Sequence, residues 1–396
     1  MRTGSVIESS CFIISPKKYH CPTTLAKICA TPEQKVLTSC LKKASLAIMN
    51  SAVISSSDPS LPLAEIQAGL EPLIAITQAG MQATNAIIVA RMQSEIDLIP
   101  TLAGHLIAAG GKRMRPMLTL AGASLAGASQ NQMDNAARLA ASVEFIHTAT
   151  LLHDDVIDES DMRRGNKTAS AIWGNEASVL VGDFLFARAF ELMVETGEIT
   201  VLGRLAAAAA RITEGEIAQM LLAGNPGAAR ADYFRVIEAK TAELFAAAAE
   251  TGAMIGGADK ALSDDMRSYG MALGIAFQIT DDALDYAASS DDMGKAVGDD
   301  FKEGKITLPV ILAWQDGDEA ERSFWRKCLQ EGEIGDSDLQ EALAILEKHN
   351  AITRSLAEAR QHAEAAAALA QTWPFLSNGT AEALVAAARF AAERTL

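Results

Sequence analysis

Cysteine and aromatic residues are scarce in this chain of 396 residues. Four of the five cysteines lie within the first 40 residues, and their spacings of 10, 8 and 11 match no CxxC zinc pattern. The rest of the chain contains a single cysteine, Cys328, and such a low content is typical of a protein from a reducing compartment. Aromatic residues make up 5% and hydrophobic residues 49%, with much alanine. Because alanine favours helices over strands, the composition indicates a helical protein with a sizeable core.

The chain also lacks a basic stretch and a long apolar run. Outside the first 45 residues no segment is strongly basic, and the formal net charge of −16 argues against a nucleic-acid binder. An anionic ligand would therefore need metal ions or a local basic cluster. No uninterrupted apolar run approaches the length of a membrane span, and the N-terminus has no signal-peptide core. We expect a cytoplasmic protein without a transmembrane segment.

Proline is rare in the middle of the chain and common at its start. Five of the 11 prolines lie in the first 62 residues, whereas only Pro116 and Pro226 lie between Thr101 and Leu308. Long helices are therefore possible in the middle segment, since proline breaks the helical hydrogen-bond ladder. We interpret residues 1–60 as a disordered N-terminal extension that ends in a Ser-rich linker, with a candidate true start at Met49. Residues 61–396 are interpreted as one all-helical domain.

Apolar residues recur at steps of three and four beyond about residue 63. This period predicts one long helix from Asn131 to about Asp158. Further helices are predicted over residues 176–197, 200–223, 231–254, 262–287 and 306–316. Glycine-containing breaks such as Gly224-Asn225-Pro226-Gly227 separate them, and no sustained strand alternation is present. We predict an all-α fold, a large single-domain helical bundle.

Two aspartate clusters carry the strongest chemical signal. The first is Asp154-Asp155-Val156-Ile157-Asp158, and the second is Asp281-Asp282-Ala283-Leu284-Asp285. Positions i and i+4 share a helix face, so each cluster presents two carboxylates side by side with a third next to them. Mg²⁺ prefers oxygen ligands and completes its octahedron with water and phosphate oxygens. The clusters therefore predict a di- or triphosphate ligand that is bridged to the protein by metal.

A solvated helix face is the plain alternative for a single cluster of this kind. Here the pattern occurs twice, and strongly apolar residues precede both copies: Leu151 and Leu152 before one, Phe277 and Ile279 before the other. A surface charge run does not usually lie at the end of a core helix. The metal interpretation is therefore favoured.

Basic residues near these clusters complete the picture of an anion site. In the segment Gly110-Gly111-Lys112-Arg113-Met114-Arg115-Pro116, the glycines allow close backbone approach, and Lys112 and Arg115 supply cations for phosphate oxygens. A basic helix start would oppose the helix dipole, which favours an anion site. Other basic residues lie near the clusters in sequence, and each would be ordinary surface by itself. They are Arg163, Arg164, Lys240, Lys295 and Lys305.

Together these segments resemble the trans-type polyprenyl (isoprenyl) diphosphate synthase family, in its long-chain octaprenyl and decaprenyl group. The matching text is GGKRMRP at 110–116, HTATLLHDDVIDESDMRRG at 147–165, KT at 240–241, FQITDDALD at 277–285 and GKAVGDDFKEGKITLP at 294–309. Five ordered motifs are highly specific, and the resemblance covers about residues 63–396. The extension before Met49 has no recognised counterpart. The resemblance implies a bundle around a deep central cavity, usually as a homodimer.

The resemblance also implies roles for the matching residues. Two or three Mg²⁺ ions per active site would be held by Asp154, Asp155, Asp158, Asp281 and Asp285, with Asp282 in support. Isopentenyl diphosphate would be bound by Lys112, Arg115, His147 and Arg164. The allylic diphosphate, expected to be farnesyl diphosphate, would be bound by Arg163, Lys240, Thr241, Gln278, Lys295 and Lys305. Ionisation of the allylic diphosphate would be followed by attack of the isopentenyl double bond and loss of a proton.

Product length would be decided below the first cluster. On the 131–158 helix, Ala149 and Thr150 lie about one turn beneath Asp154, and Ile146 and Val143 lie further down. Short-chain members of the family carry bulky aromatics at the position of Ala149 or Thr150, and both residues here are small. We therefore expect a C40 to C50 product for a quinone side chain, as in ubiquinone biosynthesis. The alternative is a synthase that makes C15 or C20.

Three other classes explain the residues less well. His153-Asp154 could belong to a metal phosphohydrolase, but that class needs several histidine ligands and the chain has only six histidines. A non-catalytic partner subunit usually lacks one aspartate cluster, and both are intact here. A terpene cyclase would not need the Gly110–Pro116 segment as a second diphosphate site. The prenyl diphosphate synthase interpretation explains all of the segments.

Overall fold

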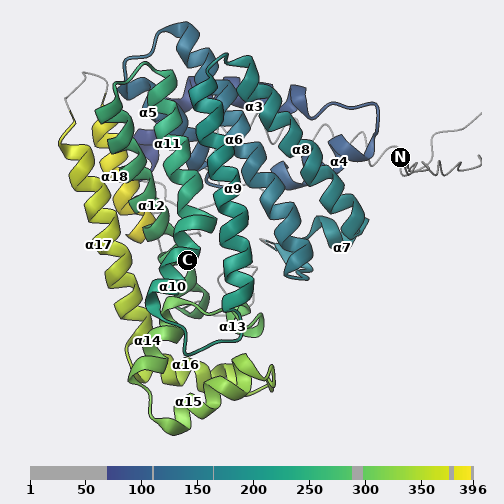
Figure 1. Ribbon diagram of the computed structural model, residues 1–396, viewed down its shortest axis with the longest axis vertical. Coiled ribbons are helices and arrows are strands. Elements are labelled where there is room, and N and C mark those ends of the chain that lie inside the picture. Colours follow the sequence, from purple (N-terminus) through teal and green to yellow (C-terminus); the bar gives the residue numbers. More distant parts are fainter. Residues whose placement is uncertain (1–68, 109–110, 164, 288–297, 374–378, 394–396) are drawn as a thin grey trace, which may run out of the picture. The chain divides into compact units, whose positions relative to one another are not determined.

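The computed structural model describes residues 69–108, 111–163, 165–287, 298–373 and 379–393, which are almost entirely helical (Figure 1). All of them belong to one compact unit of the chain. The predicted extension, residues 1–60 with Met49, lies outside the described residues, and so do Arg164 and Lys295. The prediction of an all-α fold is confirmed.

The N-terminal half of the described chain runs from α3 to α9. Helices α3 (Glu71–Arg91) and α4 (Leu98–Ala108) precede α5 (Met114–Leu125) and the long α6 (Gln130–Ile157). A short antiparallel ribbon of β1 (Met162–Arg163) and β2 (Asn166–Lys167) follows the first aspartate cluster. Then come α7 (Ala169–Trp173), α8 (Asn175–Glu195) and α9 (Ile199–Leu222). The sequence period therefore located α6, α8 and α9 to within a few residues.

The C-terminal half begins with α10 (Arg230–Ile237), the π-helical turn η1 (Glu238–Ala242) and α11 (Glu243–Ile255). Helix α12 (Lys260–Ala287) carries the second aspartate cluster. The remaining elements are α13 (Asp299–Lys302), α14 (Leu308–Asp316), α15 (Glu319–Trp325), η2 (Arg326–Gln330), α16 (Asp338–Lys348), α17 (Ala351–Gln371) and α18 (Thr380–Glu393). The single helix predicted over 231–254 is thus interrupted by a π-turn, which leaves the apolar period almost unchanged.

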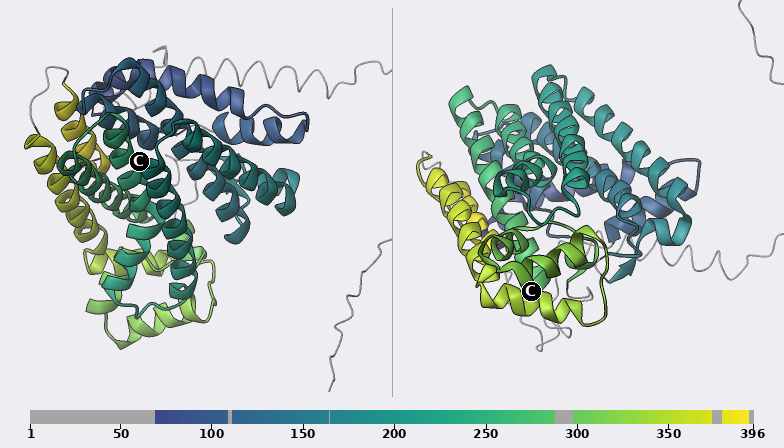
Figure 2. Two further views of the ribbon diagram at one scale, coloured as in Figure 1. Left: turned by 45° about the horizontal axis from the view of Figure 1, so that its top comes forward. Right: turned by 60° about the horizontal axis from the view of Figure 1, so that its bottom comes forward.

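Helix α11 lies in the centre of the bundle. It contacts α5, α6, α9 and α12, and α17 and α18 pack on the outer side of α12 (Figures 1 and 2). The four consecutive alanines of α11, residues 246–249, have no exposed surface. Because consecutive helical positions face different directions, α11 is covered on every side. The high alanine content thus allows several helices to approach one central helix closely.

Helix α3 is the only helix of the described residues that is long and apolar enough to cross a membrane by length and composition. It contacts α5, α6 and α18, and its side chains Leu73 and Ile88 are buried in these contacts. A single helix of this kind is weak evidence for a membrane span. The contacts favour a place in the helical bundle.

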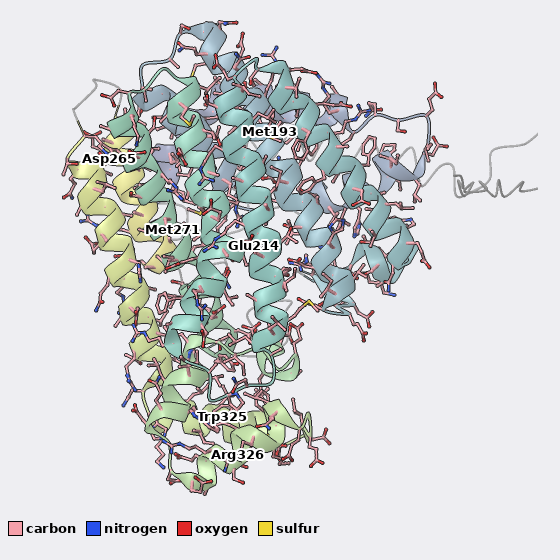
Figure 3. The ribbon with its side chains drawn as sticks, viewed as in Figure 1. Met193, Glu214, Asp265, Met271, Trp325 and Arg326 are labelled. Carbon is pink, nitrogen blue, oxygen red and sulfur yellow. The ribbon has the colours of Figure 1, made fainter. Side chains whose placement is uncertain are left out.

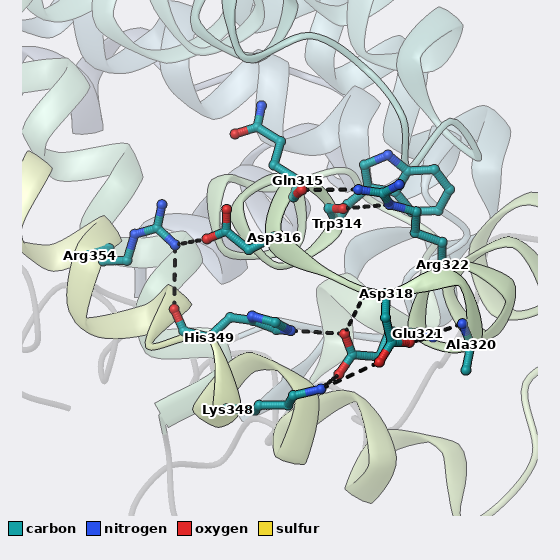
Figure 4. Close-up of polar contacts among 10 residues, drawn as sticks. All are labelled: Trp314, Gln315, Asp316, Asp318, Ala320, Glu321, Arg322, Lys348, His349 and Arg354. Atoms are coloured by element: carbon teal, nitrogen blue, oxygen red, sulfur yellow. Dashed lines mark hydrogen bonds and ion pairs between the residues drawn. The ribbon is translucent and has the colours of Figure 1, made fainter.

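Helices α14 to α17 are tied together by ionic contacts around Glu321 (Figure 4). The carboxylate of Glu321 accepts hydrogen bonds from Lys348 Nζ at 2.5 Å and His349 Nε2 at 2.9 Å. Arg354 pairs with Asp316 at 2.5 Å, which joins α17 to the end of α14. This group of contacts joins α14, α15 and α16, at the bottom of Figure 1, to the first turn of α17.

Candidate active site

An accessible seam runs along one face of α6. Five half-buried residues at steps of three and four lie on one face of α6 and at its C-cap: Glu144, His147, Thr150, Asp154 and Asp158. Leu151, His153 and Val156, on other faces of the helix, are half-buried too. Other chain-length candidates, Val143, Ile146 and Ala149, have no accessible surface. The first aspartate cluster therefore lies at the end of a seam that also passes Thr150 and His147.

Asp154 lies in a cluster contributed by α6, α9 and η1. Lys240 Nζ is 3.9 Å from an Asp154 oxygen, 2.5 Å from Glu216 Oε1 and 2.7 Å from Gln219 Oε1. Burial raises the pKa of Asp154 to about 7; Lys240 opposes this rise, and the adjacent Glu216 adds to it. Glu214, which is labelled in Figure 3, precedes Glu216 by two residues on α9. The ionised form of Asp154 is thus disfavoured by burial and would be stabilised by a cation bound beside it.

The backbone of η1 is fixed by two close helix approaches. A Cβ on Gly215 of α9 would lie 2.5 Å from the backbone nitrogen of Lys240. A Cβ on Gly274 of α12 would lie 2.5 Å from Cα of Ala242. Real Cβ atoms do not approach so closely, so α9 and α12 can pack against the backbone of the π-turn only because both positions are glycine. Such turns often mark functional sites, and this one presents Lys240 and Thr241.

Asp155 is buried beneath the β1–β2 ribbon. Arg163, which the ribbon presents, donates from Nε to Asp155 Oδ1 at 2.7 Å. The other oxygen, Oδ2, is buried and has no hydrogen-bond partner among the residues that the structure describes. Burial raises the pKa of Asp155, and Arg163 opposes the rise. A buried carboxylate oxygen without a donor is costly, so it fits a position where a cation is to be accepted.

Lys305 connects the two aspartate clusters. Its Nζ is 3.1 Å from Asp158 Oδ2 and 2.5 Å from Glu303 Oε2. Burial alone would lower the pKa of Lys305, but Asp300, Asp158 and Glu303 raise it. Lys305 also lowers the pKa of Asp282 in the second cluster. One ammonium group therefore pairs with Asp158 at the end of α6 and acts electrostatically on Asp282 of α12.

The three carboxylates of the second cluster face different surroundings. Asp281 is exposed, Asp285 is half-buried, and Asp282 is only 5% exposed. Asp285 Oδ2 accepts a hydrogen bond from the backbone N–H of Asp300 at 3.1 Å. Burial raises the pKa of Asp300 well above its ordinary value, and Asp282 and Asp285 add to the rise. Of this cluster, Asp281 and Asp285 are thus the members accessible to a ligand.

Asp282 instead ends a chain of hydrogen bonds. Tyr233 OH of α10 donates to Asp282 Oδ2 at 2.6 Å, and Gln278 Nε2 donates to Asp282 Oδ1 at 2.7 Å. Thr241 Oγ1 donates to Gln278 Oε1 at 2.8 Å. Burial raises the pKa of Asp282 to about 6, and the hydrogen bonds from Tyr233 and Gln278 limit the rise. Both oxygens of Asp282 are engaged by protein groups.

A second cationic region lies at the start of α5. Arg113 adopts a left-handed conformation (φ 47°) at the N-cap, and its side chain donates to Asn85 at 3.0 Å and lies 3.8 Å from Glu144. Arg115 stacks over the Phe245 ring at 4.2 Å, and Phe245 packs against Phe277, beside Gln278. The predicted basic helix start is therefore present, and Arg115 is linked through Phe245 to Phe277 of α12, one helical turn before Asp281.

The donor set fits Mg²⁺ better than an all-protein metal cage. Within the described ranges, no three His, Cys, Asp or Glu side chains converge closely enough to hold an ion by themselves. Mg²⁺ typically takes one or two carboxylates and fills its other positions with water and phosphate oxygens. The buried, unpartnered Oδ2 of Asp155 and the accessible carboxylates of Asp154, Asp158, Asp281 and Asp285 meet that requirement.

Several residues of this site were missed by the sequence analysis. They are Glu216, Gln219, Tyr233, Asp300 and Glu303. Glu216 and Gln219 lie one helical turn apart, a spacing that could have been noticed, and Asp300 lies within a quoted motif. Tyr233 had no sequence signal. His153 faces α8, where it contacts Val179 O at 3.2 Å and Asp183 at 3.5 Å, so it lends no support to a phosphohydrolase site.

Comparisons with known proteins agree with this geometry. The family model for polyprenyl synthetase matches residues 96–346. Octaprenyl diphosphate synthase of Escherichia coli is 39% identical over 325 residues, which cover 82% of this chain and 99% of that protein. The crystal structure of a decaprenyl diphosphate synthase from Rhodobacter capsulatus is 46% identical, with a TM-score of 0.76 over 81% of this chain and 98% of that one.

A polyprenyl synthase from Caulobacter crescentus, solved with calcium and isoprenyl diphosphate, is 47% identical. The match covers 82% of this chain and 98% of that one, with a TM-score of 0.78. The chain belongs to the polyprenyl synthetase family. The prediction of a prenyltransferase of this family is thereby confirmed.

Proposed function

We propose that this protein extends an allylic diphosphate, farnesyl diphosphate in the first instance, with isopentenyl diphosphate to a C40–C50 all-trans polyprenyl diphosphate. The names of the relatives, octaprenyl and decaprenyl diphosphate synthases, support a long product. The small side chains of Ala149 and Thr150, just before Asp154, support it too, because neither is one of the bulky aromatics expected of a short-chain synthase. We propose a quinone side chain as its use.

The observation that carries this proposal is that Lys305 pairs with Asp158 of the first cluster and lowers the pKa of Asp282 in the second, while Lys240 lies beside Asp154. An acidic protein needs such cations to receive a diphosphate. Lys240, Lys305 and Arg163 neutralise the diphosphate as it departs, and Lys112 and Arg115 hold the second diphosphate. Two or three bound Mg²⁺ ions, held by Asp154, Asp155, Asp158, Asp281 and Asp285, would supply Lewis-acid stabilisation of the leaving group.

Apolar side chains beside the seam would help to protect the reaction from water. Val143, Ile146 and Ala149 are fully buried on the adjoining faces of α6 below the aspartates. Water would trap an allylic cation, and its exclusion also strengthens the electrostatic contacts of the site. The proposal thus places the cations beside the aspartates and the growing tail along α6, next to these buried apolar side chains.

The test is an elongation assay. The protein is incubated with farnesyl diphosphate, excess isopentenyl diphosphate and Mg²⁺, and the products are sized by mass spectrometry. Products of C40 to C50 are expected, and a chelator should abolish them. Products that stop at C15 or C20 would establish the short-chain alternative, and no elongation at all would reject the enzyme. Replacing Ala149 by Phe should shorten the product, although its full burial makes some loss of stability expected, about 1–3 kcal/mol.

We further propose a homodimer that uses the outer face of α8. This helix exposes Leu180 (67%), Val194 (63%), Val179 (37%) and Phe190 (36%), more apolar surface than a solvated helix face needs. A second copy of the chain would cover these side chains. Light scattering should give twice the mass of one chain, and the double variant Leu180→Lys with Val194→Lys should shift the measured mass towards that of the monomer. An unchanged mass for this variant would place the interface elsewhere.

We propose cytoplasmic activity that does not depend on the N-terminal extension. The motifs and the family match begin well beyond Met49. Deletion of residues 1–48 should therefore leave elongation and folding intact, with circular dichroism and the same assay as readouts. Loss of folding on deletion would show that the extension belongs to the domain.

A further inference from the structure

The hydrogen-bond chain that ends at Asp282 has only one possible polarity. An ionised carboxylate can only accept, so Gln278 must turn its Nε2 towards Asp282 and its Oε1 towards Thr241. Thr241 must then donate to Gln278. Every donor in the chain points towards Asp282, and the amide of Gln278 is locked in one of its two orientations.

Tyr233 is what holds Asp282 in place. Its hydroxyl is buried and donates to Asp282 Oδ2 at 2.6 Å, a short charge-assisted hydrogen bond. The carboxylate therefore reaches Gln278 with Oδ1 and Tyr233 with Oδ2, and both helices, α10 and α12, are joined through it. Without this donor a nearly buried carboxylate oxygen would lose its partner, and Asp282 could rotate away from Gln278.

We propose that Tyr233 is a positioning residue of the allylic site: through Asp282 it fixes the orientation of Gln278 and Thr241. This inference rests on the proposed function and on the roles that the family resemblance implies for Gln278 and Thr241 at the allylic diphosphate. Tyr233 itself contacts no substrate, because it lies behind Asp282 and is 2% exposed. Its effect should therefore fall on the allylic substrate and spare isopentenyl diphosphate, which is assigned to the start of α5.

The chain offers a matched control for this idea. Tyr269 of α12 is also fully buried, and its hydroxyl donates to the carbonyl of Leu384 at 2.7 Å, against α18. Tyr233→Phe and Tyr269→Phe each remove one buried hydroxyl and one hydrogen bond. Any general effect on folding is shared by the two variants, whereas only Tyr233 is connected to Gln278.

The experiment is steady-state kinetics of the full chain, with each substrate varied in turn. Tyr233→Phe should lower kcat/KM for farnesyl diphosphate by about ten-fold or more, the effect of losing a hydrogen bond to a charged group. The KM for isopentenyl diphosphate should stay within about two-fold, and Tyr269→Phe should match the wild type in both. Equal kinetics for the two tyrosine variants would overturn the inference.

A double-mutant cycle with Asp282→Asn tests the route. The side-chain amide introduced by this substitution can turn an N–H towards Gln278, so the variant should show the same allylic defect. If Tyr233 acts through Asp282, adding Tyr233→Phe to Asp282→Asn should cause little further loss, whereas additive losses would refute the route. Should Tyr233→Phe not fold, Asp282→Asn with normal allylic kinetics would still reject the inference. A wild-type protein without elongation would instead reject the proposed function.

Discussion

Helix α6 should act as a ruler for product length. Thr150 and Val143 precede Asp154 by four and eleven residues, so at about 1.5 Å per residue they lie about 6 Å and about 16 Å below it. At about 100° per residue, both lie within about 40° of the Asp154 direction. Phenylalanine at either position should therefore block the same path at two depths.

The expected difference follows from the size of an isoprene unit. Each unit adds four main-chain bonds of about 1.5 Å, which project to about 5 Å along an extended tail. The spacing of about 10 Å between the two blocks thus equals about two units. Thr150→Phe should stop the product near C15–C20, and Val143→Phe should allow about two units more.

The assay is the mass of the products formed from farnesyl diphosphate with excess isopentenyl diphosphate. Ala207→Phe is the control, since it adds the same ring to an exposed alanine of α9 and should leave the product unchanged. Val143 is fully buried, so a lower melting temperature is expected for its variant. Identical product lengths for the Thr150 and Val143 variants, or wild-type lengths for both, would refute the ruler.

Three further predictions concern charged groups. Lys305→Met should lower kcat/KM for the allylic diphosphate by about 100-fold, because Asp158 and Glu303 lose their shared cation. The KM for isopentenyl diphosphate should change little, and equal losses for both substrates would contradict a role of Lys305 at the allylic site. Arg204→Met should cost about 3–5 kcal/mol in denaturant unfolding, because Glu243 and Glu250 are only 9% and 13% exposed, whereas Arg211→Met at an exposed pair should cost under about 1 kcal/mol. Burial opposes ionisation of Glu321, but hydrogen bonds from Lys348 and His349 lower its pKa from 4.5 to about 2. The stability that ionised Glu321 contributes is therefore present above pH 4.5 and lost as the pH falls towards 2. Between pH 7 and 3 the melting temperature should fall less steeply for Glu321→Gln than for the wild type, and parallel curves would show that Glu321 does not stabilise the fold in this way.

The fold was largely predictable because its helices are long and their apolar period is regular. The period located α6 and α12 well, since each is 28 residues long and packs on several neighbours. The π-turn η1 could not be found this way. One extra residue in a turn shifts the hydrogen-bond register, but it leaves residue types and average spacing almost unchanged.

The site was predictable as a set of motifs but not as a geometry. The letters of the second cluster do not reveal that Asp281 is exposed while Asp282 is buried against Tyr233, which lies 49 residues earlier in the chain. The same limit applies to Glu216, whose importance depends on the close approach of Gly215 to Lys240. Contacts between distant segments depend on packing, which a local pattern does not encode. The assigned roles of the aspartates and basic residues stay predictions.

The lysines at the aspartate clusters have a consequence for turnover. Lys240 and Lys305 already lie against Asp154 and Asp158, so the site holds resident counter-ions before any substrate arrives. An incoming diphosphate and its metal ions must then exchange partners with these lysines, and no bare charge has to be created or left behind. We therefore expect diphosphate to bind more weakly, and to leave more easily, than the number of charges alone would suggest. An enzyme that adds one isoprene unit after another would benefit from lysine–aspartate pairs that form again each time diphosphate is released, because the site is then ready for the next cycle.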